Sequence, residues 1–205
     1  MKINTIISWS LKIALILLFL FFIYEKKYQY ALGSLISILI FLTPFILKKK
    51  YDVYLPWIFD LLIVLPLFLF IFGSFLGLYK YETYSIVTHF IGTIIIALLA
   101  FSLAFTLNIT NQLRLTIKQI MLFTIVFSMA IGVLWEIGEF ISDTNFNTQV
   151  QRSNKDTMLD LIFDTISGIV TSIIGALYIK YAPQHKVNKN IVDPFATMLK
   201  IRKRY

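Results

Sequence analysis

The run of residues from Ser85 to Asn108 constrains the fold of this chain more than any other feature. Its only ionisable side chain is His89, and most of the remaining residues are Ile, Leu, Ala or Phe. A helix of about 20 apolar residues crosses the hydrocarbon core of a bilayer. Composition agrees, because 58% of the 205 residues are hydrophobic and only 15% are charged, against about 25% in soluble domains. The sequence therefore predicts an integral membrane protein.

Apolar segments along the whole chain predict an all-α, polytopic membrane protein with about six transmembrane helices. Their ranges are 6–24, 30–47, 54–78, 86–107, 119–141 and 157–181. No connection is long enough for a separate domain, so we expect one transmembrane domain over residues 1–181 and a basic cytoplasmic tail over 182–205. No small-residue cleavage site follows the first segment, which favours an uncleaved span over a signal peptide.

Basic residues predict the orientation of the helices. Of the 19 Lys and Arg residues, only five lie on the side opposite the two termini: Lys26, Lys27, Lys80, Arg152 and Lys155. Cytoplasmic loops carry the excess of Lys and Arg, so both termini are expected in the cytoplasm. The partners expected are the lipid bilayer and, at the basic edge that ends in "KIRKRY", anionic lipid. Basic residues spread along a membrane edge argue against nucleic-acid binding, and the oligomeric state is left open.

Acidic residues are concentrated near the fifth connection. Six of the 11 Asp and Glu residues lie between positions 136 and 164: Glu136, Glu139, Asp143, Asp156, Asp160 and Asp164. At 100° per residue, the two Glu residues share one helical face with Asp143, and the later Asp residues form a second stripe. By the predicted orientation, these groups and His89 lie toward the extracytoplasmic ends of three consecutive helices.

The depth of the carboxylates suggests where they face. Asp164 lies eight residues after Asp156, or about 12 Å along a helix axis. A charged Asp at the centre of a span costs about 2.5–3.5 kcal/mol on insertion scales. The carboxylates are therefore expected to face the bundle interior or a wet cavity rather than lipid.

Simpler interpretations remain for individual residues. Ser153, three residues before Asp156, resembles a helix-capping residue. The role of Asp156 could therefore be limited to closing the start of the helix. Asp143 is expected in the following loop, in solvent, and Asp60 is expected to be paired near the cytoplasmic membrane surface. A structural hydrogen-bond network is a possible role for the whole cluster.

Carboxylates beside one imidazole can bind a divalent cation, and the residues offered as metal ligands are His89, Glu136, Glu139, Asp160 and Asp164. The chain lacks the H-E-x-x-H and Glu-x-x-His metal motifs. The same groups could instead carry protons. No Cys is present, and no Ser stands in a nucleophile elbow.

The segments "THFIG", "WEIGEF" and "QVQRSNKDTMLDLIFDTISG" resemble the uncharacterised YjdF-type family of small prokaryotic membrane proteins. More distantly they are similar to VanZ-like proteins, which are associated with glycopeptide antibiotic resistance. The likeness covers about residues 79–175, and the matching positions are His89, Glu136, Glu139, Asp156, Asp160, Asp164 and Gly168. Ser85 departs from the pattern, because these families usually carry Asp four residues before the His. The resemblance implies a multi-pass protein of the prokaryotic plasma membrane and brings no established reaction.

Three functions remain open, and the sequence does not decide whether the protein is an enzyme. The leading hypothesis is an acidic, divalent-metal-binding site near the extracytoplasmic face that acts on an envelope lipid or glycan precursor. The first alternative is a small proton- or cation-coupled transporter. The second is a non-catalytic membrane scaffold.

Overall fold

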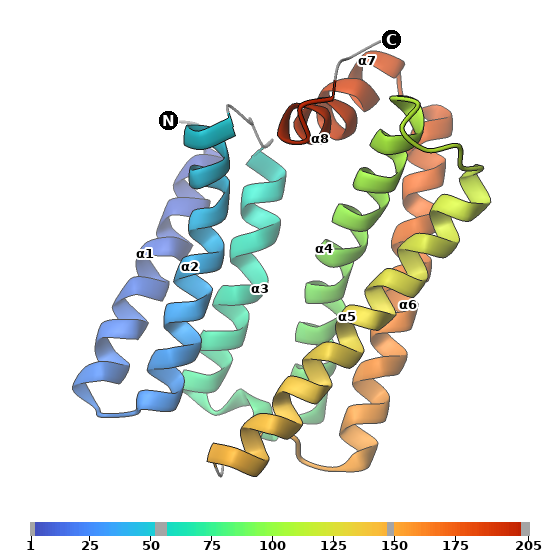
Figure 1. Cartoon of the computed structure of the whole chain (residues 1–205). Helices are drawn as coiled ribbons and strands as arrows, with labels where there is room; N and C mark the ends of the chain where they lie inside the picture. The colour runs from blue at the N-terminus through green and yellow to red at the C-terminus, as the bar shows by residue number, and fades with distance from the viewer. Residues whose placement is uncertain (1–2, 52–56, 147–149, 202–205) are drawn as a thin grey trace. The chain divides into compact units, whose positions relative to one another are not determined.

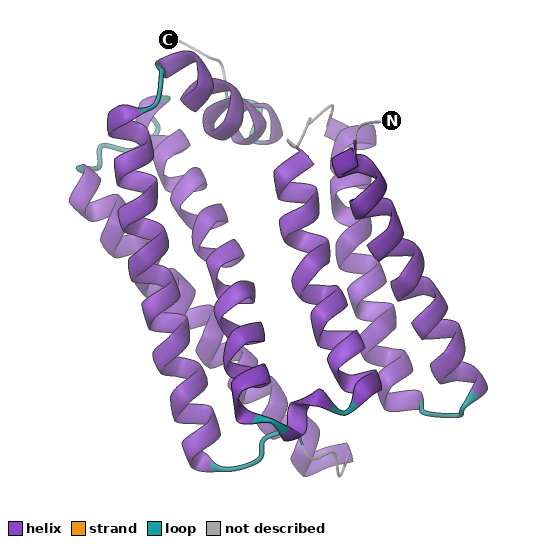
Figure 2. Ribbon diagram, turned by 180° about the vertical axis from the view of Figure 1, so that it is seen from behind, coloured by secondary structure: helices purple, strands orange, loops and turns teal. Residues whose placement is uncertain are grey.

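The computed structural model describes residues 3–51, 57–146 and 150–201, and all their regular structure is helical (Figures 1 and 2). The chain divides into two compact units, residues 1–84 and 85–205. Six long helices occupy the predicted segments: α1 (Ile3–Tyr24), α2 (Tyr28–Tyr51), α3 (Trp57–Leu76), α4 (Glu82–Ile109), α5 (Ile117–Phe146) and α6 (Asn154–Tyr181). The all-α fold is therefore confirmed, and the domain boundary at residue 181 stays a prediction.

Five of the long helices have the length and hydropathy of membrane spans: Ile6–Tyr24, Tyr28–Lys50, Glu82–Ile109, Ile117–Asn145 and Asn154–Tyr181. The sixth, within α3, is a shorter apolar helix over Asp60–Leu76, and residues 54–56 of its predicted range lie outside the described residues. Most helices extend beyond the apolar segments because a helix can continue into its polar flanks, where water satisfies the last backbone groups.

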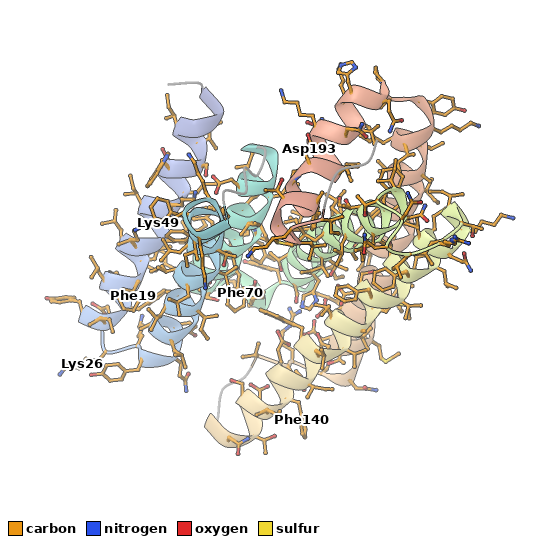
Figure 3. All side chains as sticks on the ribbon, turned by 45° about the horizontal axis from the view of Figure 1, so that its top comes forward. Phe19, Lys26, Lys49, Phe70, Phe140 and Asp193 are labelled. Atoms are coloured by element: carbon orange, nitrogen blue, oxygen red, sulfur yellow. The ribbon has the colours of Figure 1, made fainter. Side chains whose placement is uncertain are left out.

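The first unit packs α1, α2 and α3 around an apolar core. Its buried side chains are Leu15, Phe22, Ala31, Phe41, Val64 and Ile71. Phe19 and Phe70, labelled in Figure 3, pack against this cluster. Lys12 of α1 donates to both carboxylate oxygens of Asp60 on α3, at 2.7 and 2.9 Å. The pairing expected for Asp60 is confirmed.

The second unit contains α4, α5 and α6, and two glycines of these helices allow close approach. The position of a Cβ at Gly168 of α6 would overlap the hydroxyl of Ser128 on α5. A Cβ at Gly132 of α5 would overlap the carboxylate of Asp164 on α6. The small residues of α6, which recur every four positions, are buried: Ser167, Gly168, Thr171, Ser172 and Gly175. Small residues at this spacing let helices approach closely.

The segment after α6 folds onto one end of this unit. It comprises α7 (Gln184–Val187), a π-helical turn η2 (Asn188–Val192) and α8 (Asp193–Met198). Its apolar side chains enter a core formed by Phe101, Ala104, Phe105, Ile120, Val187, Ile191, Val192 and Ala196. The sequence predicted only a basic tail here, because a pattern of five or six apolar residues is too short to indicate a packed helix.

Candidate functional site

His89 is the centre of the polar groups buried in the second unit. It lies on α4, and its side chain is 11% exposed. The Nε2 atom lies 3.6 Å from Oδ2 of Asp160 on α6 and 3.9 Å from Oε1 of Glu136 on α5. The other ring nitrogen, Nδ1, lies 3.7 Å from Oδ1 of Asp164. The imidazole is therefore surrounded by three carboxylates from two neighbouring helices.

Three of these residues have the geometry of a metal-ligand set. His89, Glu136 and Asp160 each offer one ligand atom, and the three atoms lie within 4.8 Å of one another. Metal–ligand bonds of about 2.0–2.5 Å place neighbouring ligand atoms about 3–4 Å apart. The separations from Nε2, 3.6 and 3.9 Å, fall in that range and are too long for direct hydrogen bonds.

Each carboxylate at this site has one oxygen with no hydrogen-bond partner. These atoms are Oε1 of Glu136, Oδ1 of Asp160 and Oδ2 of Asp164, and the three residues are 5%, 1% and 0% exposed. Within the described residues, their only ion pairs are those with His89. A buried charged group without a partner costs several kcal/mol, so groups arranged in this way are expected to share a cation or a proton.

Polar groups of α4 and of the α5–α6 connection hold the remaining carboxylate oxygens. Ser85 donates to Oδ2 of Asp160 at 3.4 Å, and Thr93 donates to Oδ1 of Asp164. Ser85 thus contacts an acid of α6. Gln151 donates its side-chain amide to Oε2 of Glu136 at 3.2 Å.

Glu139 and Asp156 lie beside this group and have their own partners. Oε1 of Glu139 accepts a hydrogen bond from Nε1 of Trp135, at 2.8 Å, and Trp135 meets the ring of His89 edge-on with 6.4 Å between centroids. Asp156 is buried and pairs with Arg152. Its backbone N–H donates to Ser153, so the predicted helix cap is confirmed.

Asp143 differs from the prediction. It lies inside α5, and its two carboxylate oxygens accept hydrogen bonds from the backbone N–H groups of Val150 and Gln151, each at 2.8 Å. A loop location was expected because the apolar run ends at Ile141. The carboxylate instead accepts hydrogen bonds from the connection that leads to α6. Its partners lie seven and eight residues later in the sequence, so the local pattern does not indicate this role.

Sequence reasoning missed Gln151 and Trp135. Gln151 belongs to a polar connection whose course has no local signature, and Trp135 would fit a lipid-facing position equally well. A weak signal existed for Trp135, because it precedes Glu139 by four residues, the spacing at which helical side chains meet.

The sequence matches, over residues 7–181, the family described as "Predicted membrane protein (DUF2238)". YjdF-type proteins are this family, so the resemblance carried by the His, Glu and Asp segments is confirmed. No curated protein and no solved structure matches the chain.

Proposed function

Since the chain belongs to this predicted membrane protein family, which brings no established reaction, we propose a function from the site alone: the buried acidic group is a divalent-metal site. His89 Nε2, Glu136 Oε1 and an oxygen of Asp160 are the ligands. The observation that carries the proposal is that three buried carboxylates, each with one oxygen that lacks a hydrogen-bond partner, surround one imidazole. A cation placed between these atoms compensates their charge and supplies the missing interactions.

Asp164 fits the role of a positioning residue. Metal-binding His residues commonly direct their second ring nitrogen to a carboxylate, which fixes the ring and its tautomer. In this protein Asp164 faces Nδ1, whereas Glu136 and Asp160 approach Nε2. Thr93 in turn donates to Asp164, so the supporting carboxylate is itself held.

A set of three protein ligands favours a catalytic metal site over a structural one. Structural zinc sites use four protein ligands, while catalytic sites use three and leave a position for water or substrate. A cation at an open position can activate a water and polarise a bound oxygen. Because the three ligands lie on membrane-spanning helices, the substrate class that fits is an envelope lipid or lipid-linked glycan precursor. The excess of Lys and Arg on the side of the two termini supports a site that opens toward the extracytoplasmic face. The resemblance to prokaryotic membrane proteins supports the plasma membrane as its location.

Elemental analysis of the purified protein tests the metal site. We expect close to one divalent metal ion per wild-type chain and its loss in His89→Ala, Glu136→Gln and Asp160→Asn. These variants should keep the thermal unfolding midpoint of the metal-free wild type. Glu25→Gln, an exposed acid between α1 and α2, is the matched control and should retain the metal. The proposal is wrong if the wild type neither contains a metal nor binds added Mn²⁺ or Zn²⁺ after chelation.

A second candidate function, proton or cation transport, is favoured by Asp164. Its Oδ2 is buried without a partner, farther along α6 than Asp160, which is the arrangement of a carboxylate relay in a transporter. Cation- or pH-gradient-driven flux in proteoliposomes that is lost in Asp164→Asn would support this function. Substrate turnover without flux would support the enzyme, which can be followed by mass spectrometry of candidate lipids incubated with protein and Mn²⁺.

A further inference from the structure

We infer that Gln151 is a positioning residue that holds Glu136 in its metal-binding orientation; this inference rests on the proposed metal site. Gln151 lies in the connection between α5 and α6, fifteen residues after Glu136. Its side-chain amide donates to the backbone carbonyl of Glu136 at 3.1 Å and to Oε2 of the same residue at 3.2 Å. Both contacts are made to the residue whose Oε1 faces His89.

The two acceptors determine which end of the amide faces Glu136. A carbonyl oxygen and a carboxylate oxygen only accept hydrogen bonds, and the NH₂ group of Gln has two hydrogens to donate. The opposite amide orientation would place a third acceptor against them. Gln therefore engages Oε2 and leaves Oε1, which has no hydrogen-bond partner, as the oxygen available to a cation.

The backbone of Gln151 is fixed independently of its side chain. Asp143 accepts from the N–H of Gln151 and from that of Val150, each at 2.8 Å. One residue further on, Arg152 pairs with Asp156 on the first turn of α6. The connection is therefore attached to α5 on one side of Gln151 and to α6 on the other, which limits the positions that the amide can reach.

A hydrogen bond that holds one oxygen of the Glu136 carboxylate affects how tightly the other oxygen can bind a cation. A Glu side chain has three rotatable bonds and loses rotamer entropy when a cation fixes it. A hydrogen bond that already fixes the carboxylate removes part of this cost and selects the oxygen that binds. Loss of such supporting contacts typically lowers metal affinity about 10- to 100-fold.

Substitution of Gln151 in the full-length protein tests the inference, with binding of Mn²⁺ followed by the EPR signal of the free ion. We expect Gln151→Ala to weaken Mn²⁺ binding about 10- to 100-fold. Gln151→Asn, one methylene shorter, should weaken it similarly because its amide does not reach Glu136. Gln151→Glu should also weaken it, because a carboxylate cannot donate a hydrogen bond to Oε2 of Glu136 and repels its charge. Neighbouring Lys155→Gln is the matched control and should bind as the wild type does.

The unfolding midpoint of the metal-free protein separates positioning from a general effect on folding. If Gln151 acts by holding Glu136, Gln151→Ala should lose Mn²⁺ affinity while its metal-free midpoint stays close to that of the wild type. The inference is overturned if Gln151→Ala binds Mn²⁺ as tightly as the wild type, or if its affinity falls only together with the metal-free midpoint. Absence of Mn²⁺ binding by the wild type would instead overturn the metal site itself, so the two failures are distinguishable.

Discussion

His89 Nδ1 lies 3.7 Å from Oδ1 of Asp164, at the ring nitrogen that Glu136 and Asp160 do not approach. The imidazole thus faces Asp164 with one ring nitrogen and the two acids proposed as metal ligands with the other. This relation predicts different consequences for two Asp residues that are one helical turn apart. Asp160 contributes a ligand atom, and Asp164 orients the ring that contributes another.

We therefore expect Asp160→Asn to abolish divalent-metal binding and Asp164→Asn to weaken it about 10- to 100-fold. An Asn at position 164 still offers an oxygen to the hydroxyl of Thr93, so the local packing is maintained. Titration of both variants with Mn²⁺ measures the difference. Equally complete loss in the two variants would show that Asp164 is itself a metal ligand.

Gly132→Ala should disturb the site from the opposite helix. The added Cβ overlaps the carboxylate of Asp164, and overpacking of this kind typically costs about 1–3 kcal/mol. We expect a lower unfolding midpoint in detergent and weaker metal binding. Gly138→Ala, on the same helix but with no atom within 4 Å of the added Cβ, should be neutral or stabilising by up to about 1 kcal/mol. Equal midpoints for the two variants would contradict the close contact between α5 and α6 at Asp164.

The ion pair of the first unit should contribute to stability without affecting the metal. Lys12→Met leaves the Asp60 carboxylate without its cation, and we expect a loss of about 1–3 kcal/mol in the free energy of unfolding. The double variant Lys12→Met/Asp60→Leu should recover much of this loss, because it removes both charges. Mn²⁺ affinity should be unchanged in both, since all the proposed ligands lie in the second unit. A parallel fall in metal affinity would mean that the two units are energetically coupled.

The orientation predicted by the basic residues can be measured separately. A reporter active only in the cytoplasm should be active at the C-terminus and inactive when inserted between Glu25 and Lys27. Accessibility of Cys introduced at these positions is a second measurement, and the natural absence of Cys makes the labelling specific. A C-terminus found outside would reverse the side to which the acidic site opens.

The long helices were predicted well from the sequence, because a membrane-spanning helix can be recognised from its own run of apolar residues. Asp156, Asp160 and Asp164 were correctly expected to face the protein interior, since their spacing and the cost of charge in lipid leave few alternatives. The partners of these acids were harder to predict. Ser85 and Thr93 lie 75 and 71 residues before Asp160 and Asp164, and Gln151 lies 15 residues after Glu136. Helical periodicity gives no information about the rotation of one helix against another.

Asp143 and the C-terminal segment illustrate the same limit in different ways. For Asp143, the apolar pattern ended before the helix did, so a residue that fastens the α5–α6 connection was assigned to solvent. For residues 184–198, the apolar side chains occur singly or in pairs between polar ones. Only the end of α4 and the start of α5 make their burial possible.

The C-terminal segment also gives the two units different orders of assembly. All the buried residues of the first unit's core lie at or before Ile71. Its three helices can therefore pack while the remainder of the chain is still being made. The second unit cannot complete its core until Val187, Val192 and Ala196 have emerged. During synthesis, Phe101 and Phe105 must therefore wait for a segment more than 80 residues later, and this interval is when the second unit is most open to proteolysis and to membrane chaperones.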